Sequence, residues 1–378
     1  MTKHITTSSS GSVMAVWHHD SPQPELFRRQ LRSGSYRWTR YGPLRSISRP
    51  RANRGNFALS GNGERFVFRG REKRFLVLEY RKDIGKWKRV GKSISAYQSL
   101  QGFEERELSM AMSDDGNTVV AGNLVAVRRP EQKSGWKTVT LYRPSPPPKQ
   151  FPNSRERLGA SAVSRDGLTV GIMVSKSIPS NRSFQAEYSS QLFLYTRPSV
   201  NSTKWRQLNN ETYALTAFLG MDDFSGLSDC ARQVPFGDPD SLHISDDGTV
   251  VAVKGYDSRY FSGSGSFWEA NAMAFLVNRR ARSADDVFTP MGESPILLNI
   301  DSLAMSGNGR RIITGLDQAA HVYDFDKSKN VWQPTAAWRL RGSRGTKVAI
   351  NQEGKLVSFN ADRINPPVIQ AIRTFLLS

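Results

Sequence analysis

The most constraining feature of this sequence is a short motif that recurs seven times along its 378 residues. In each copy an apolar run is followed by Ser, two further residues and Gly, and then by a second apolar run. The regular copies read FALSGNGERFVF (57–68), MAMSDDGNTVVAG (110–122), SAVSRDGLTVGI (161–172), LHISDDGTVVAV (242–253) and LAMSGNGRRIITG (303–315). Degenerate copies read TTSSSGSVMAVW (6–17) and VAINQEGKLVSF (348–359). A unit repeated this often predicts a repeat architecture.

Each copy of the motif has the composition of a tight hairpin. Asp-Gly and Asn-Gly supply the positive φ angles that a two-residue turn between twisted strands demands. The Ser just before them can bond turn amides, and apolar runs such as 118–121 favour strands buried on both sides. We therefore interpret these residues as determinants of the fold and assign none of them a catalytic role.

A Trp followed by a polar residue is a second recurring mark, about 20 to 40 residues after the glycine. It occurs at Trp38, Trp87, Trp136, Trp205 and Trp332. A further apolar run usually lies between the two marks, so each unit supplies four short strands. About 50 residues per four-stranded unit is the size of a propeller blade.

The best match to a known repeat spans 87–122. Trp87-Lys-Arg-Val-Gly-Lys-Ser-Ile, followed by Ser-Asp-Asp-Gly-Asn-Thr-Val-Val-Ala-Gly at 113–122, resembles the WD-like propeller repeats common in microalgal and bacterial proteins. The resemblance covers nearly the whole chain. It implies a β-propeller but no particular activity, because one fold serves many functions.

These patterns predict an all-β protein built as a single β-propeller domain over 1–378. We expect seven four-stranded blades, with six or eight as the alternatives. The blades are expected to start near residues 5, 57, 110, 161, 242, 303 and 347, with insertions at 175–190, 209–240 and 255–271. The atypical terminal copies leave ring closure open, and the fourth strand of the last unit is either missing or supplied from elsewhere.

The formal net charge of +19 is concentrated in one part of the chain. Residues 28–92 contain 20 Lys and Arg against four acids, whereas 211–248 contains eight acids and one Arg. A local excess of this size is a candidate docking surface for a polyanion. The alternative is that the charges serve solubility alone.

Blade topology would place the basic segment on outer strands and on one face, with the acidic insert roughly opposite across the ring. The predicted polyanion- or partner-binding residues are Arg28, Arg29, Arg32, Arg37, Arg40, Arg45, Arg49, Arg51, Arg54, Arg69, Arg71, Lys73 and Arg74. The loop at 255–271 is a second candidate contact. Its aromatic residues are Tyr256, Tyr260, Phe261, Phe267 and Trp268. They form either a partner-binding surface or a loop that buries its own aromatics.

Several kinds of site have little support in the sequence. The single cysteine, Cys230, excludes a disulfide framework and a zinc site built on several thiolates. The run 18–20 (His-His-Asp) is poor metal-binding geometry, because neighbouring strand residues point to opposite faces. No phosphate-binding loop or nucleophile elbow is present. We therefore expect no catalytic residue, metal or cofactor.

The N-terminal segment lacks the apolar region of a secretory signal, and no stretch has the roughly 20 apolar residues of a membrane span. We expect an intracellular protein that is not membrane-spanning, in a compartment that the sequence does not define.

The functional hypothesis is a non-enzymatic interaction scaffold. It would be a structural subunit of a large assembly, such as a virion or a ribonucleoprotein, that docks through its basic sector. The partners would be other protein subunits with acidic surfaces, or RNA or DNA held by phosphate contacts. Self-association between sectors of opposite charge is a variant. The alternative is a propeller hydrolase or lyase with a site at the axial channel.

Overall fold

The structure is a computed structural model of the chain. It describes residues 2–18, 24–32, 35–42, 57–69, 74–95, 109–129, 135–143, 155–179, 186–208, 213–214, 242–257, 269–279, 287–292, 300–316, 319–339, 343–363 and 373–376.

The described residues form seven antiparallel sheets, numbered here in chain order. The first sheet contains β1 (Thr2–Thr7), β2 (Val13–His18), β3 (Glu25–Arg32) and β4 (Ser35–Arg40). The second contains β5 (Phe57–Leu59), β6 (Arg65–Arg69), β7 (Arg74–Arg81), β8 (Lys86–Arg89) and β9 (Ile94–Ser95). The third contains β10 (Met110–Met112), β11 (Thr118–Ala121), β12 (Leu124–Arg128) and β13 (Trp136–Thr140).

The remaining four sheets follow the same chain order. The fourth contains β14 (Arg155–Val163), β15 (Thr169–Pro179), β16 (Ala186–Thr196), β17 (Arg206–Gln207) and β18 (Tyr213–Ala214). The fifth contains β19 (Leu242–Ile244), β20 (Val250–Asp257), β21 (Glu269–Val277) and β22 (Phe288–Pro290). The sixth contains β23 (Ser302–Met305), β24 (Arg311–Leu316), β25 (Ala319–Asp326) and β26 (Val331–Arg339). The seventh contains β27 (Ser343–Ile350), β28 (Leu356–Arg363) and β29 (Arg373–Leu376).

The fold is an all-β propeller with four-stranded blades, but the predicted number of blades is wrong. Within the described ranges six sheets contain a complete path of four strands, and the seventh contains only three. We therefore count six complete blades instead of seven. The fourth strand of the other units usually carries the recurring Trp, and the sequence has no Trp after Trp338 to mark such a strand in the last unit.

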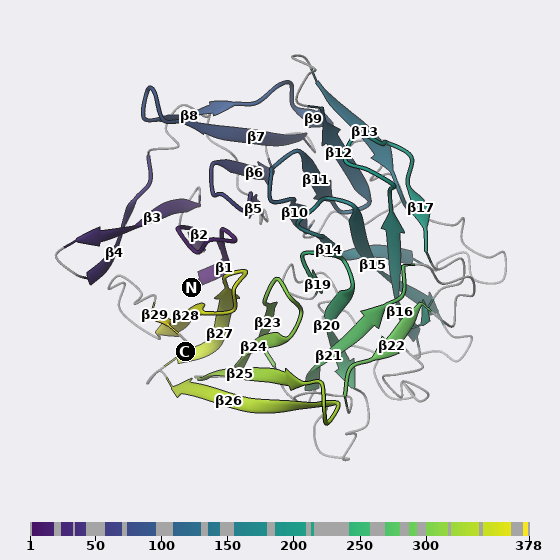
Figure 1. Ribbon diagram of the computed structural model, residues 1–378. Coiled ribbons are helices and arrows are strands. Elements are labelled where there is room, and N and C mark those ends of the chain that lie inside the picture. Colours follow the sequence, from purple (N-terminus) through teal and green to yellow (C-terminus); the bar gives the residue numbers. More distant parts are fainter. Residues whose placement is uncertain are drawn as a thin grey trace.

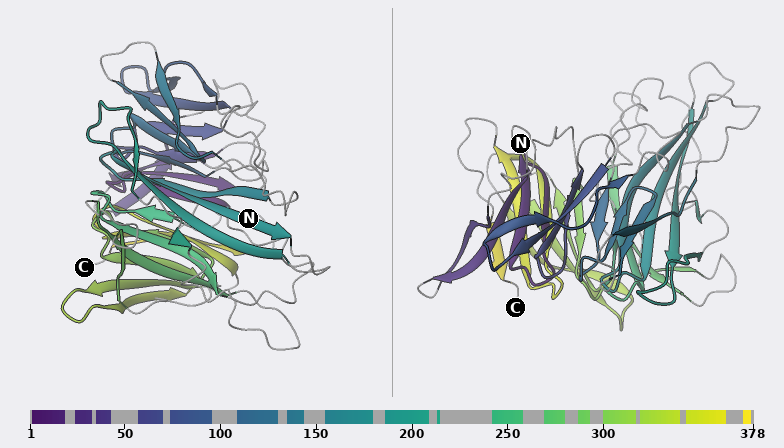
Figure 2. Two further views of the ribbon diagram at one scale, coloured as in Figure 1. Left: turned by 90° about the vertical axis from the view of Figure 1, so that its right-hand side faces the viewer. Right: turned by 90° about the horizontal axis from the view of Figure 1, so that it is seen from above.

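The sheets stand around a central axis, with the first strand of each sheet innermost (Figures 1 and 2). Ring closure, which the sequence left open, is achieved by contact between β27 and β1. The Gln352 N–H donates to the Ser9 carbonyl at 2.9 Å, and Thr7 Oγ1 donates to the Ile350 carbonyl at 3.3 Å. In the described part of the chain no strand is shared between the first and seventh sheets.

The repeated motif forms the hairpin turn between the first two strands of each sheet. In the third sheet the Gly116 N–H donates to the Ser113 carbonyl, and Ser113 Oγ accepts from the Thr118 N–H, both at 2.9 Å. Ser113 Oγ also donates to Asp115 Oδ1 at 2.6 Å. The expected role of Ser in binding turn amides is thus confirmed. The prediction of a two-residue turn is wrong. Four residues, 114–117, lie between Ser113 and Thr118, whose backbones are hydrogen-bonded, and among these four only Gly116 has a positive φ, of 66°.

The recurring Trp links the outer strand of one sheet to the sheet before it. The indole N–H of Trp87 donates to the Tyr41 carbonyl at 3.0 Å, that of Trp136 to Val90 at 3.2 Å, and that of Trp332 to Met291 at 2.8 Å. Each acceptor is followed by a glycine with positive φ, at positions 42, 91 and 292. A Cβ there would come within 3.2–3.4 Å of the Trp ring. Each Trp and the glycine after its acceptor, which is not the motif glycine, therefore form one contact between neighbouring sheets.

Two of the predicted insertions are partly strand. β15 extends to Pro179 and β16 begins at Ala186, so most of 175–190 continues the hairpin of the fourth sheet. β20 likewise extends to Asp257 and β21 begins at Glu269. Of 209–240, the structure describes only Tyr213 and Ala214, which pair with β16. The acidic insert and the centre of the aromatic loop lie outside the described residues.

The motif glycines predict a specific sensitivity to substitution. Gly309 has φ +69°, and a Cβ there would lie 2.6 Å from Val250 Cβ of the preceding sheet. Gly309→Ala should lower the free energy of unfolding by about 2–4 kcal/mol, from left-handed strain plus overpacking. Guanidinium chloride unfolding measures this change.

Gly135→Ala is the matched control, because a Cβ at Gly135 meets no atom within 4 Å. It should change the free energy of unfolding by less than about 0.5 kcal/mol. Equal effects of the two substitutions would contradict the role given to the motif glycine.

Candidate functional site

The β3–β4 hairpin of the first sheet gathers five of the predicted arginines, and the side chains of four of them are described. Register pairs Arg29 with Trp38 and places Arg37 opposite Gln30. The Arg28 guanidinium lies 5.1 Å from the centre of the Tyr41 ring, a distance at which cation–π attraction operates. Arg40, with 78% of its side chain exposed, forms an ion pair with Glu25 at 3.1 Å. These arginines therefore lie on an outer hairpin at the rim of the ring.

The second sheet adds cations that the sequence alone did not single out. Arg69 ends β6 and Arg74 begins β7, so the two predicted residues flank one connection. β8 reads Lys86-Trp87-Lys88-Arg89, and its three cations are exposed while Trp87 is buried. The signal for Lys86 and Lys88 was present in the sequence, since a buried Trp on an edge strand turns its immediate neighbours to the opposite, outward face. Together, the described Arg and Lys residues of the first and second sheets are called the basic rim.

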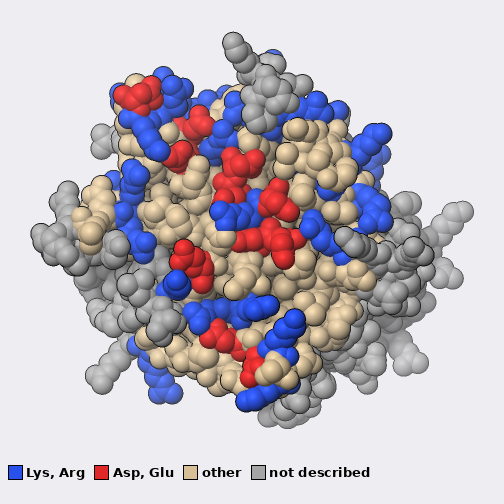
Figure 3. All heavy atoms as spheres, in the orientation of Figure 1, with Lys and Arg blue, Asp and Glu red and all other residues tan. Residues whose placement is uncertain are grey.

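The acids of these two sheets are already engaged. Their described residues include fifteen Lys and Arg but four acids. The ion pairs are Glu25 with Arg40, Glu64 with Lys82, Glu79 with Arg65 and Asp83 with Arg81. The positive charge of the basic rim therefore exceeds what the described acids of the same sheets neutralise. Figure 3 shows Lys and Arg side chains spread along the upper and left edge of this view of the molecule.

The other predicted contact residues are not placed. Arg32 and Tyr256 are described only as backbone, in β3 and β20. The residues outside the described part of the chain are Arg45, Arg49, Arg51, Arg54, Arg71, Lys73, Tyr260, Phe261, Phe267 and Trp268. Their grouping with the basic rim stays a prediction.

A second constellation surrounds the axis, where the turns of all seven motif copies meet. The residue after the motif Ser, or after Asn in the last copy, lines this opening in each copy. These seven ring residues are Ser9, Gly61, Asp114, Arg165, Asp246, Gly307 and Gln352. Backbone hydrogen bonds join neighbouring turns, such as Asp114 N–H to the Arg165 carbonyl at 3.0 Å. The sequence indicates only that the motif forms a turn. It does not indicate that the residue after the motif Ser lines the axial mouth.

An arginine between two aspartates dominates this mouth. Arg165 Nε lies 2.8 Å from Asp114 Oδ2, and Arg165 Nη1 lies 3.7 Å from Asp246 Oδ2. Ser9 Oγ donates to Asp114 Oδ1 at 2.6 Å. Glycines stand beside the carboxylates because a Cβ at Gly61 or Gly307 would overlap them, at 1.1 and 2.2 Å. Burial raises the pKa of the Asp246 carboxyl above its ordinary 3.8, whereas Arg165 and Gln352 oppose that rise.

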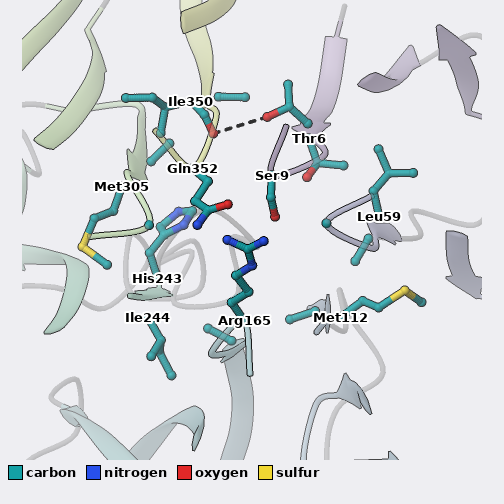
Figure 4. A pocket seen from close by; sticks show the side chains of 18 of the residues that line it. Thr6, Ser9, Leu59, Met112, Arg165, His243, Ile244, Met305, Ile350 and Gln352 are labelled. Carbon is teal, nitrogen blue, oxygen red and sulfur yellow. Dashed lines mark hydrogen bonds between the residues drawn. The ribbon is translucent and has the colours of Figure 1, made fainter. Parts of the chain in front are cut away.

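The mouth opens into a cavity of about 240 Å³ along the axis. Its wall is mostly apolar below the ring, with Leu59, Met112, Ile244, Met305 and Ile350 in view (Figure 4). His243 is an exception, and its Nε2 lies 2.8 Å from the Leu303 carbonyl. The charged residues of the ring above this cavity, by contrast, contact one another.

Two further findings bear on the class of protein. In the ranges that the structure covers, no group of three or more His, Cys, Asp or Glu side chains is arranged to hold a metal ion. The same ranges contain no helix with the length and apolar character needed to cross a membrane.

Comparisons with known proteins identify the fold. No protein-family model matches the sequence, and no curated protein matches it. The structure of U3-55K is similar over 100% of this chain and 95% of that chain, with 10% identity and a TM-score of 0.51. The crystal structure of the Myceliophteria thermophila Cps50 (Swd1) β-propeller domain is similar over 100% of this chain and 97% of that one, with 10% identity and a TM-score of 0.54.

At this identity the likeness shows the fold alone. The second neighbour is a β-propeller domain, and both likenesses extend over the whole chain, which supports the β-propeller expected from the sequence. The particular repeat pattern of microalgal and bacterial proteins stays a prediction.

The environment of Asp246 predicts how stability depends on pH. Because the pKa of Asp246 is higher in the folded protein, this carboxyl binds its proton more tightly there than in the unfolded chain. Its contribution to the free energy of unfolding is therefore lost as pH rises above 3.8. Asp246→Asn does not titrate, so its free energy of unfolding relative to wild type should increase with pH. Urea unfolding from acid to neutral pH measures this slope.

Asp83→Asn is the control with the opposite sign. A hydrogen bond from Arg81 lowers the pKa of the exposed Asp83 carboxyl, so its contribution is present above 3.8 and is lost as pH falls. The relative stability of Asp83→Asn should therefore decrease with rising pH. Slopes of the same sign for both variants would refute the assignment.

Proposed function

We propose that this chain is a non-enzymatic interaction scaffold that docks through its basic rim onto an anionic partner within a macromolecular assembly. The neighbours of known structure support the propeller fold. A rigid ring with short strands at its edge is a suitable platform for binding, since function on such folds resides in the surface they present.

One observation carries the proposal: exposed cations line the outer strands of two adjacent sheets whose described acids are already paired. Lys86, Lys88 and Arg89 project from β8, and Arg37 is exposed on the neighbouring β4. An uncompensated excess of this kind attracts an anionic surface and accelerates its association. Arginine also pairs with carboxylate or phosphate in a bidentate manner.

The axial mouth gives less support to the alternative of an enzyme. Asp114 accepts from Ser9 and pairs with Arg165, so neither charged group is poised on its own for acid, base or nucleophilic chemistry. His243 lies within hydrogen-bonding distance of a backbone carbonyl. These contacts favour a structural role for the ring residues, and the outer surface is left as the functional one.

Neutralising the β8 cations tests the proposal. Labelled poly-glutamate and a single-stranded RNA serve as probes, titrated by fluorescence anisotropy at several salt concentrations. The triple variant K86Q/K88Q/R89Q should bind about tenfold more weakly, since each exposed charge pair contributes about 0.3–1 kcal/mol. For RNA, the dependence of log affinity on log salt should also flatten, by about 0.7 for each phosphate that the variant no longer neutralises.

A second triple variant removes the same charge elsewhere. Lys204, Arg310 and Lys327 are exposed on the fourth and sixth sheets, and K204Q/R310Q/K327Q should bind as wild type does. An equal weakening of binding in the two triples would indicate attraction by net charge alone. Binding of neither probe would count against the basic rim as a docking surface.

A further inference from the structure

The axial cavity is a feature that the proposed docking function leaves unused, and the contacts of its ring argue against catalysis but not against binding. It has a volume of about 240 Å³ and is lined by the first strands and turns of all seven sheets. An apolar cavity of about 150 Å³ is large enough to bind benzene. We propose that this cavity binds a small amphiphilic cation, an alkylammonium whose head contacts Asp246 and whose apolar tail lies in the cavity. The inference goes beyond the proposed function and does not depend on the basic rim.

The wall directly below the charged ring is apolar. The residue before the motif Ser, or before Asn in the last copy, lines the cavity in every sheet. These residues are Thr7, Leu59, Met112, Val163, Ile244, Met305 and Ile350, and five of them are labelled in Figure 4. Thr7 is the only polar one of the seven, and its hydroxyl donates to the Ile350 carbonyl at 3.3 Å. Because methionine side chains adapt to irregular shapes, this layer suits an alkyl chain.

The next layer leaves space because most of its residues are small. The residues two places before the motif Ser or Asn are Thr6, Ala58, Ala111, Ala162, His243, Ala304 and Ala349. Five of these seven are alanine, and His243 Nε2 lies 2.8 Å from the Leu303 carbonyl. An apolar tail that passes the first layer would therefore meet mainly methyl groups.

The charges at the mouth select a cation. The ring contains two carboxylates and one guanidinium, so its net charge is −1. Both oxygens of Asp114 are engaged, one by Ser9 Oγ at 2.6 Å and the other by Arg165 Nε at 2.8 Å. Asp246 is held less closely, because Arg165 Nη1 lies 3.7 Å from its Oδ2, beyond the range of a hydrogen bond. A ligand cation can therefore neutralise Asp246, whereas a ligand carboxylate would be repelled by both aspartates.

The surroundings of Asp246 favour such a cation. This side chain is half-buried, and burial raises the pKa of its carboxyl, although Arg165 and a hydrogen bond from Gln352 oppose the rise. Repulsion by the carboxylates of Asp114 and Asp247 raises that pKa further. A half-buried carboxylate close to like charges gains more from a bound cation than an exposed one does.

The test titrates n-hexylammonium into the full chain by isothermal titration calorimetry. Hexan-1-ol and hexanoate carry the same tail with a neutral or an anionic head, and methylammonium has the head alone. The n-hexylammonium ion should bind at least about tenfold more tightly than each of these three probes. Lengthening the tail from butyl to hexyl should tighten binding about fourfold per methylene, until the cavity is full.

Two substitutions of opposite sign separate ligand binding from damage to the ring. Asp246→Asn removes the charge that holds the head and should weaken n-hexylammonium binding about tenfold. Arg165→Gln removes the competing cation and should tighten binding about threefold or more. Damage to the ring alone would weaken binding in both variants. Asp83→Asn changes an exposed acid outside the cavity and should leave the affinity unchanged.

Three results would overturn the inference. If hexan-1-ol or hexanoate binds as tightly as n-hexylammonium, the charged mouth does not select the head. If methylammonium binds as tightly, or if Asp83→Asn weakens binding as much as Asp246→Asn, the cation pairs with surface acids and does not enter the cavity. If n-hexylammonium does not bind at all, the cavity is not a site for this class of ligand.

The comparison of heads and tails uses the wild-type chain, so it decides the inference even if a variant fails to fold. None of the three results would affect the basic rim, which is tested with poly-glutamate and RNA.

Discussion

The contact on which this structure depends is the packing of each motif turn against the turn beside it. The motif glycine at 116, for example, would place a Cβ 2.6 Å from the Arg65 side chain of the preceding sheet. Only a residue without a side chain allows this approach, and only glycine adopts its positive φ at low cost. The approach lets backbone hydrogen bonds run from turn to turn and close between Gln352 and Ser9. The glycine that each turn needs for its own conformation is therefore also needed for neighbouring sheets to pack into a closed ring.

The packing of neighbouring turns determines which motif positions stay the same from copy to copy and which differ. Ser and Gly are fixed by the turn, so the residue between them that faces the axis is where the copies differ. The result is an Arg165 held by Asp114 and Asp246 at the mouth, with glycines beside the carboxylates. The outer strands are fixed by the Trp that bonds the preceding sheet. Their alternate side chains face outward, and in the first two sheets these include many arginines and lysines.

Much of the fold was predictable because each residue of the repeat specifies the structure of its own short segment. Ser113 and Gly116 imply the hairpin, and Trp87 implies the outer strand, since each acts through backbone bonds that need no knowledge of distant sequence. The seventh sheet, which has three strands in the described part of the chain, was harder to predict, because only the absence of a Trp marks it. The axial cluster could not be predicted, since the meeting of Asp114, Arg165 and Asp246 depends on the closed ring. The exposure of Lys86 and Lys88 on β8 was predictable from the alternation around Trp87, but that of Arg89 was not, because it shares the face of Trp87.

Closure at the axis also explains how the ring stays closed although the described residues of the seventh sheet form only three strands. The seventh sheet is held by its inner strands, where Val348 and Val357 pack on the sixth sheet and Ala349 packs on the first. The Gln352–Ser9 bond lies at the same inner radius. An outer strand adds hydrogen bonds at the rim, where water competes for them, so its net contribution is about 1 kcal/mol per bond. The inner strands of the seventh sheet therefore hold the ring closed without hydrogen bonds at the rim.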